Sequence, residues 1–209
     1  MLDKSPVLDE FFVDAVAEVL NIAMGNAAAS LSEMINEEVQ LSVPGVQFVS
    51  RTEAALIIGK NTKTNVSGVL QPFHGAFGGE AMLLFPEKQS LELVRAVLQQ
   101  DDLTLEDLTD MEQEAMTEIG NVILNACLCS IADMFSQEMF GEIPEFIQGS
   151  LNKVFAVESG VDNSDAIVML LNMDFSVEKK KIQGYVTFLM DVNSVAQFKA
   201  NIEEFLGVE

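Results

Sequence analysis

Two pairs of polar residues, each a glutamate followed three positions later by an asparagine, stand a hundred residues apart in the chain. Glu18 precedes Asn21, and Glu118 precedes Asn121. Residues three apart on a helix lie one turn apart on the same face. Each pair therefore places a carboxylate beside a carboxamide. A carboxylate can hold a cation, and a carboxamide can both accept a hydrogen bond from water and donate one to it.

The stretch around each pair also recurs. Residues 14–44 read DAVAEVLNIAMGNAAASLSEMINEEVQLSVP, and residues 114–144 read EAMTEIGNVILNACLCSIADMFSQEMFGEIP. At about 100° per residue, each stretch divides into a polar stripe and an apolar side. We predict two long amphipathic helices, at about 8–36 and 109–137, that bury the apolar side and expose the pair. The polar stripes contain Asp14, Glu18, Asn21 and Gly25 in the first stretch and Glu114, Glu118, Asn121 and Asn125 in the second; Phe12 and Met34 lie on the apolar side of the first.

Short apolar runs between turn residues follow each predicted helix and indicate strands. A short helix closes each half of the chain, so the order long helix, strands, short helix occurs twice. The sequence predicts one α+β domain over residues 1–209 with pseudo-twofold symmetry and one shared, mostly antiparallel sheet covered by helices. The two repeats span about 8–99 and 109–206, and an acidic linker at 100–110 joins them. The predicted strands include residues 39–49, 54–60, 66–73, 80–85, 153–160, 165–177 and 181–191, and the short helices lie at 88–99 and 193–206.

The spacing of the first stretch resembles the signature of the CheC-type chemotaxis phosphatases, the CheC/CheX-like response-regulator phosphatases. This signature reads Asp or Ser, three residues, Glu, two residues, Asn, twenty-two residues, Pro. Asp14, Glu18, Asn21 and Pro44 fit it throughout, whereas Glu114 replaces Asp or Ser in the second stretch. The resemblance implies hydrolysis of the aspartyl phosphate on a response regulator such as CheY.

The resemblance also implies how the site residues act. An aspartyl phosphate is already activated, and the regulator supplies its own Mg²⁺ and lysine, so we expect no cofactor bound by this chain. The group still needed is one that places a water in line with phosphorus, and positioning of this kind lowers a phosphoryl-transfer barrier. We predict that the two asparagines orient the water and that the two glutamates pair with a cation on the regulator. The predicted catalytic residues are Glu18, Asn21, Glu118 and Asn121, and the predicted docking residues are Asp14 and Glu114.

The charge of the chain excludes some partners. The formal net charge is −22, from 33 acidic and 11 basic residues. Nucleic acids and anionic membranes require clustered lysine and arginine, so neither is expected as a partner. The sequence contains no run of about 18 apolar residues, so no membrane span is expected, and no signal peptide is expected at the N-terminus. We therefore predict a cytoplasmic protein.

Other chemistries find no support in the sequence. Cys127 and Cys129 lie two apart on one predicted helix and cannot bridge each other, so we expect both to be packing residues. His74, the single histidine, has no evident catalytic partner, and we expect a structural or surface role for it. The glycines at 75–79 lack the lysine of a phosphate-binding loop and indicate a turn or bulge.

Three alternatives to a phosphatase remain open at this point. The chain could bind a phosphorylated regulator without hydrolysing the phosphate, or it could be a stable partner of a CheD-like deamidase. It could also be a flagellar-switch relative, in which we would expect a further C-terminal domain. If both sites are active, we expect Asn21 to matter more than Asn121, because Glu114 is one methylene longer than aspartate and lies on the docking stripe.

Overall fold

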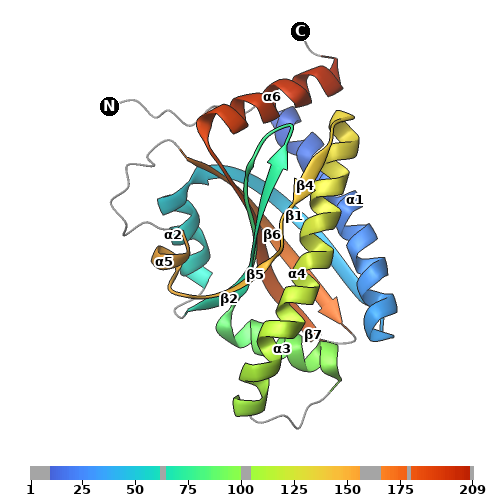
Figure 1. Ribbon diagram of the computed structural model, residues 1–209, viewed down its shortest axis with the longest axis vertical. Helices are drawn as coiled ribbons and strands as arrows, with labels where there is room; N and C mark the ends of the chain where they lie inside the picture. The colour runs from blue at the N-terminus through green and yellow to red at the C-terminus, as the bar shows by residue number, and fades with distance from the viewer. Residues whose placement is uncertain (1–9, 62–64, 100–104, 156–165, 178–179, 208–209) are drawn as a thin grey trace.

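The computed structural model describes residues 10–61, 65–99, 105–155, 166–177 and 180–207 (Figure 1). These residues form six helices and seven strands. The helices are α1 (Glu10–Ile35), α2 (Arg51–Asn61), α3 (Glu87–Leu98), α4 (Leu105–Phe135), α5 (Leu151–Val154) and α6 (Val192–Leu206). The strands are β1 (Val39–Ser50), β2 (Val66–Gly75), β3 (Gly79–Pro86), β4 (Met139–Gly141), β5 (Glu145–Gly149), β6 (Ile167–Val177) and β7 (Lys180–Met190).

The strands form one seven-stranded sheet in the order β1-β6-β7-β3-β2-β4. The seventh strand, β5, pairs with β2 on the same edge as β4. Every pairing between these strands is antiparallel. The two halves of the chain exchange strands: β1 lies next to β6 of the second half, and β4 and β5 lie next to β2 of the first. The α+β class with one shared antiparallel sheet is confirmed. The division into repeats at 8–99 and 109–206 stays a prediction, with which this strand order is compatible.

Both faces of the sheet are buried. On β3, Leu83 belongs to one apolar core and Leu84 to the other, because successive side chains of a strand point to opposite faces. Helices α1, α3, α4 and α6 cover the larger core, and α2 and α5 cover the smaller one (Figure 1). This cover explains why the strands read as nearly continuous apolar runs.

Helices α1 and α4 lie side by side on the larger core and run in opposite directions (Figure 1). Their buried residues recur every three or four positions, as the sequence predicts; Val16, Leu20 and Ala23 are examples on α1. The polar stripes of both helices remain outside the core. Met34, predicted on the buried side, is instead 42% exposed, since it lies at the end of α1.

Two predicted strands are wrong. Residues 54–60 lie in α2, and α5 contains the first residues of the run predicted at 153–160, of which 156–165 fall outside the described residues. The start of α2 is a reciprocal capping box: Glu53 N donates to Ser50 Oγ at 3.2 Å, and Ser50 N donates to Glu53 Oε2 at 2.9 Å. The Glu53 carboxylate accepts from Ser50 N and also from Ser50 Oγ, at 2.8 Å, and these two bonds, the backbone one foremost, lower the pKa of Glu53. The sequence contained this signal, a serine followed three residues later by a glutamate.

The linker and the sheet edge also differ from the prediction. The acidic linker was predicted at 100–110, but α4 begins at Leu105, so 105–110 are helical and 100–104 lie outside the described residues. The short edge strands β4 and β5 were not predicted. Three and five residues long, they lack the extended alternation from which a strand is recognised.

A buried polar contact joins α3 to α4. Ser90 Oγ donates a hydrogen bond to Glu112 Oε1, and both side chains are buried. Replacing Ser90 by alanine leaves a buried carboxyl group without this partner, which is expected to lower the free energy of unfolding by about 1–3 kcal/mol. Urea unfolding of the variant measures the loss. The double variant Ser90→Ala, Glu112→Met, in which both polar groups are absent, should recover most of it; no difference between the single and the double variant would contradict this role.

Candidate functional site

The six predicted site residues lie on the two long helices, outside the core. Asp14, Glu18, Glu114 and Glu118 are exposed, and the two asparagines are half-buried. Glu118 lines a pocket together with Met34, at the far end of α1 from Glu18. From residue 18 to residue 34, α1 rises by about 24 Å at 1.5 Å per residue. The two glutamate–asparagine pairs are therefore two separate sites.

In the first site, the Asn21 carboxamide is bonded to the backbone of Val43. Asn21 Oδ1 accepts from Val43 N at 2.9 Å, and Asn21 Nδ2 donates to Val43 O at 3.1 Å and to Ala17 O at 3.0 Å. Both hydrogens of the Nδ2 group are thus used. We call this contact the Asn21–Val43 clamp. It ties the middle of α1 to β1.

The neighbouring proline explains the clamp. Pro44 has no N–H to donate, and the register of β1 against β6 shifts between Ser42 and Gly45. Val43 therefore leaves the regular ladder, while its side chain is buried. Because buried backbone groups need hydrogen-bond partners, the Asn21 carboxamide takes both the N–H and the C=O of Val43. The fixed distance between asparagine and proline has a structural reason in the first half of the chain.

In the second site, the asparagine is bonded to other side chains. Asn121 Oδ1 accepts from Asn125 Nδ2 at 2.7 Å, and Asn125 Oδ1 accepts from Gln71 Nε2 at 3.1 Å. Gln71 Nε2 also donates to Glu142 O at 2.9 Å. We call Asn121, Asn125 and Gln71 the amide chain. Within the described ranges, Asn121 Nδ2 forms no hydrogen bond, so its two donors are available.

Two glycines leave room for the amide chain. A Cβ at Gly120 would lie 2.7 Å from the Cβ of Val69, so glycine lets α4 approach β2 closely. A Cβ at Gly141 would lie 2.6 Å from Gln71 Nε2. The sequence placed Asn125 on the polar stripe but did not identify Gln71. A lone glutamine within the apolar run 66–73 was the signal available.

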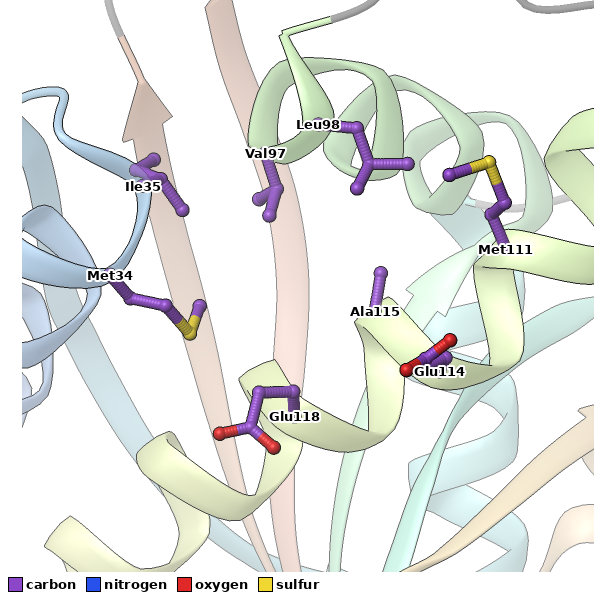
Figure 2. A pocket seen from close by; sticks show the side chains of 8 residues that line it. All are labelled: Met34, Ile35, Val97, Leu98, Met111, Glu114, Ala115 and Glu118. Atoms are coloured by element: carbon purple, nitrogen blue, oxygen red, sulfur yellow. The ribbon is translucent and has the colours of Figure 1, made fainter.

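A pocket adjoins the second site. It has a volume of about 460 Å³ and lies between the ends of α1 and α3 and the N-terminal half of α4 (Figure 2). Figure 2 shows the carboxylates of Glu114 and Glu118 on the α4 side and apolar side chains around the rest. The sequence did not predict this pocket, because its walls come from three separate segments. The residues that line it are Met34, Ile35, Val97, Leu98, Met111, Glu114, Ala115 and Glu118.

The remaining candidate residues do not form a second chemical centre. Burial raises the pKa of Cys127 to about 12, so its thiol stays protonated at neutral pH. Cys129 is exposed, so the expectation that both cysteines are packing residues is wrong for it; both are free thiols. His74 is a surface residue whose ring stacks on Phe140 at 5.6 Å, with Nδ1 3.9 Å from Glu142 Oε1.

Metal binding and membrane insertion are two other possible properties of the described residues. Among the side chains that the structure describes, no three of His, Cys, Asp or Glu form a group that could hold a metal ion. By length and composition, residues 12–35 and 111–135 could each cross a membrane, although neither contains a continuous apolar run near 18 residues long. In this fold both helices pack on the sheet and expose carboxylates such as Glu18 and Glu118, and charged groups are costly within a bilayer.

The sequence matches the CheC-like family over residues 13–47, which include the complete first motif. It is 22% identical over 187 residues to the CheY-P phosphatase CheC of Bacillus subtilis, covering 87% of this chain and 89% of that protein. The fold is similar to that of FliY from Thermotoga maritima, with a TM-score of 0.74, 16% identity and coverage of 95% of this chain and 99% of that chain. It is also similar to a chain of the CheX–CheY–BeF3–Mg²⁺ complex from Borrelia burgdorferi, with a TM-score of 0.50, 18% identity and coverage of 81% and 97%. These similarities confirm the predicted resemblance of this chain to the CheC-like chemotaxis family.

Proposed function

We propose that this protein hydrolyses the aspartyl phosphate of a CheY-like response regulator, and that Glu118 and Asn121 form its principal site. The similarity to the CheY-P phosphatase CheC and the likeness in fold to a chain of a CheX–CheY complex support the reaction and the partner. The amide chain is the observation that carries the choice of site. It holds Asn121 by its oxygen and leaves the Nδ2 donors available.

The second site has the groups that the reaction needs from this chain. The exposed Glu118 carboxylate pairs with a cation on the regulator and so holds the partner in register. Asn121 orients a water molecule: Nδ2 donates to it, and the lone pair of Oδ1 that Asn125 does not use accepts from it. The water attacks phosphorus, the bond between phosphorus and the aspartyl oxygen breaks with its electron pair on the aspartate carboxylate, and both protons of the water leave with inorganic phosphate as H2PO4⁻. Mg²⁺ comes with the regulator and stabilises the charge on the phosphoryl oxygens.

The first site is secondary in this proposal. Glu18 is exposed, as is Glu118, but Asn21 must release both Val43 and Ala17 O before both of its Nδ2 hydrogens can face a water molecule. This reverses the order expected from the sequence, in which Asn21 mattered more. Asp14 and Glu114 remain the proposed docking residues one turn before each glutamate. A cytoplasmic location follows from the partner proposed, and a CheD-like deamidase remains an alternative partner.

The proposal is tested by phosphate release from a panel of the host's phosphorylated CheY-like regulators, with Mg²⁺ present and with or without this protein. At least one regulator should lose its phosphate faster when the protein is added in catalytic amounts. If the protein instead binds the regulators and leaves phosphate release at the intrinsic rate, it is a binding module and the phosphatase proposal is wrong.

Salt should affect binding of the regulator more than turnover. An ion pair between Glu118 and a regulator cation is partly exposed, and charges at a surface are screened over about 8–10 Å near physiological ionic strength. We therefore expect KM to rise as sodium chloride is increased from 50 to 500 mM, on the order of tenfold, while kcat changes less. A KM that does not respond to salt would remove the ion pair from the proposal.

A further inference from the structure

The phosphatase proposal does not use the pocket beside Glu118. Its apolar walls come from the ends of α1 and α3 and from Met111 and Ala115 of α4, and Met34 in these walls is 42% exposed. Glu118 belongs both to the pocket and to the proposed site. A regulator that contacts Glu118 and places its phosphoryl group at Asn121 would therefore also lie against the pocket.

We propose that this pocket receives an apolar side chain of the response regulator, from a segment in which a lysine or arginine stands next to it. The proposal rests on the proposed function, since the same regulator occupies both places. The pocket would fix which regulators bind, whereas Asn121 acts on the phosphoryl group that they share.

Charge and shape decide the chemistry of this occupant. Among the described residues that line the pocket, the charged side chains are two carboxylates, Glu114 and Glu118, and both are exposed (Figure 2). The other lining side chains are apolar. A neutral apolar segment would leave the carboxylates unpaired, and an acidic segment would be repelled. An apolar side chain beside a cation satisfies both parts of the surface.

The walls suit a side chain more than a rigid small molecule. Met34 and Met111 face each other across the hollow, with Val97 between them in the view of Figure 2. Methionine has three rotatable bonds and a polarizable sulfur, so it adapts to the shape of a partner's side chain. In protein interfaces, a few apolar anchors that fill pockets of this kind carry much of the affinity.

Residues that stand 100 positions apart in the two long helices provide matched controls for each other. Ala115 lines the pocket, and Ala15 is its counterpart on α1; both are half-buried. Likewise Met34 has Met134 as its counterpart. If the regulator docks on both polar stripes and no side chain enters the pocket, the two members of each pair should respond alike. If the pocket takes a side chain, the members at the pocket should respond more strongly.

The first experiment follows the methionine methyl groups by NMR while the host's CheY-like regulator, activated with beryllium fluoride and Mg²⁺, is added to the full-length protein. We expect the signals of Met34 and Met111 to shift, and that of Met134 to stay nearly unchanged. Equal shifts at Met34 and Met134, or no shift at either pocket methionine, would overturn the proposal.

The second experiment fills the pocket. Ala115→Phe should raise both the dissociation constant of the activated regulator and the KM of phosphate release by about tenfold or more, while kcat stays within twofold. Ala15→Phe should change the dissociation constant and KM by less than twofold. Thermal unfolding verifies that both variants are folded. If Met34 and Met111 shift without any phosphate release, the pocket proposal stands and the phosphatase proposal falls. If Ala115→Phe releases phosphate with an unchanged KM, the phosphatase proposal stands and the pocket proposal falls. If no regulator of the panel binds, both proposals fall.

Discussion

Replacing Asn121 by alanine is expected to slow phosphate release at saturating regulator by roughly 10²-fold or more, with little change in KM. The variant keeps Glu118 and the pocket, so the regulator should still bind. It loses the one group of the second site that can hold the attacking water, because the Asn125 carboxamide is already bonded to Gln71. Single-turnover measurements of phosphate release at several regulator concentrations separate kcat from KM.

Asn125→Ala is the companion variant. It leaves Asn121 in place but removes the donor to its oxygen, so the carboxamide can rotate. We expect a smaller fall in kcat than for Asn121→Ala and again an unchanged KM, as befits a positioning residue. Circular dichroism should show both variants to be folded, since alanine is the better helix former at these positions of α4. Near-normal turnover in a folded Asn121→Ala variant would falsify the assignment of the second site.

Replacing Asn21 by alanine should instead destabilise the protein. The change removes the partners of Val43 N and Val43 O at the point where β1 leaves its ladder. An unsatisfied buried polar group costs about 1–3 kcal/mol, so we expect the free energy of unfolding to fall by about 2–3 kcal/mol in urea denaturation. Turnover measured well below the melting temperature should fall much less than in Asn121→Ala.

Asn26→Ala provides the control for this loss. Asn26 is an exposed asparagine on the same helix, five residues further on, and its replacement removes an amide without opening the clamp. Its stability should equal or slightly exceed that of the unchanged protein. If Asn21→Ala proves as stable as Asn26→Ala and loses turnover as Asn121→Ala does, Asn21 is a second water-positioning residue and the clamp is not its main role.

The periodic parts of the structure could be predicted from the sequence because their signals are local. The apolar positions of α1 and α4 recur at helical spacing over many turns, and the long strands β6 and β7 are apolar runs between turn residues. The error at α2 has a different origin. Residues 54–60 form a short apolar run, for which periodicity does not separate helix from strand, and the capping box at Ser50 and Glu53 decides the outcome.

The state of the site residues could not be predicted, because it depends on contacts between distant segments. Asn21 and Asn121 are the same residue type in matching stretches of sequence, yet their partners differ. Asn21 bonds to Val43, 22 residues later, whereas Asn121 belongs to the amide chain, in which Asn125 bonds to Gln71, 54 residues earlier. Gly25 takes the place that Asn125 holds in the second half. The pocket likewise exists only once α1, α3 and α4 have packed together.

The exchange of strands between the halves governs the order in which the protein can assemble during synthesis. When the first half has left the ribosome, β1 has no partner, since Val39 pairs with Val177 more than a hundred residues later. An unpaired strand edge is a template for association with other chains, and contacts of long sequence separation form slowly. The Asn21–Val43 clamp, in contrast, lies wholly within the part made first. It can hold β1 against its own helix, and so shield that strand, until β6 is synthesised.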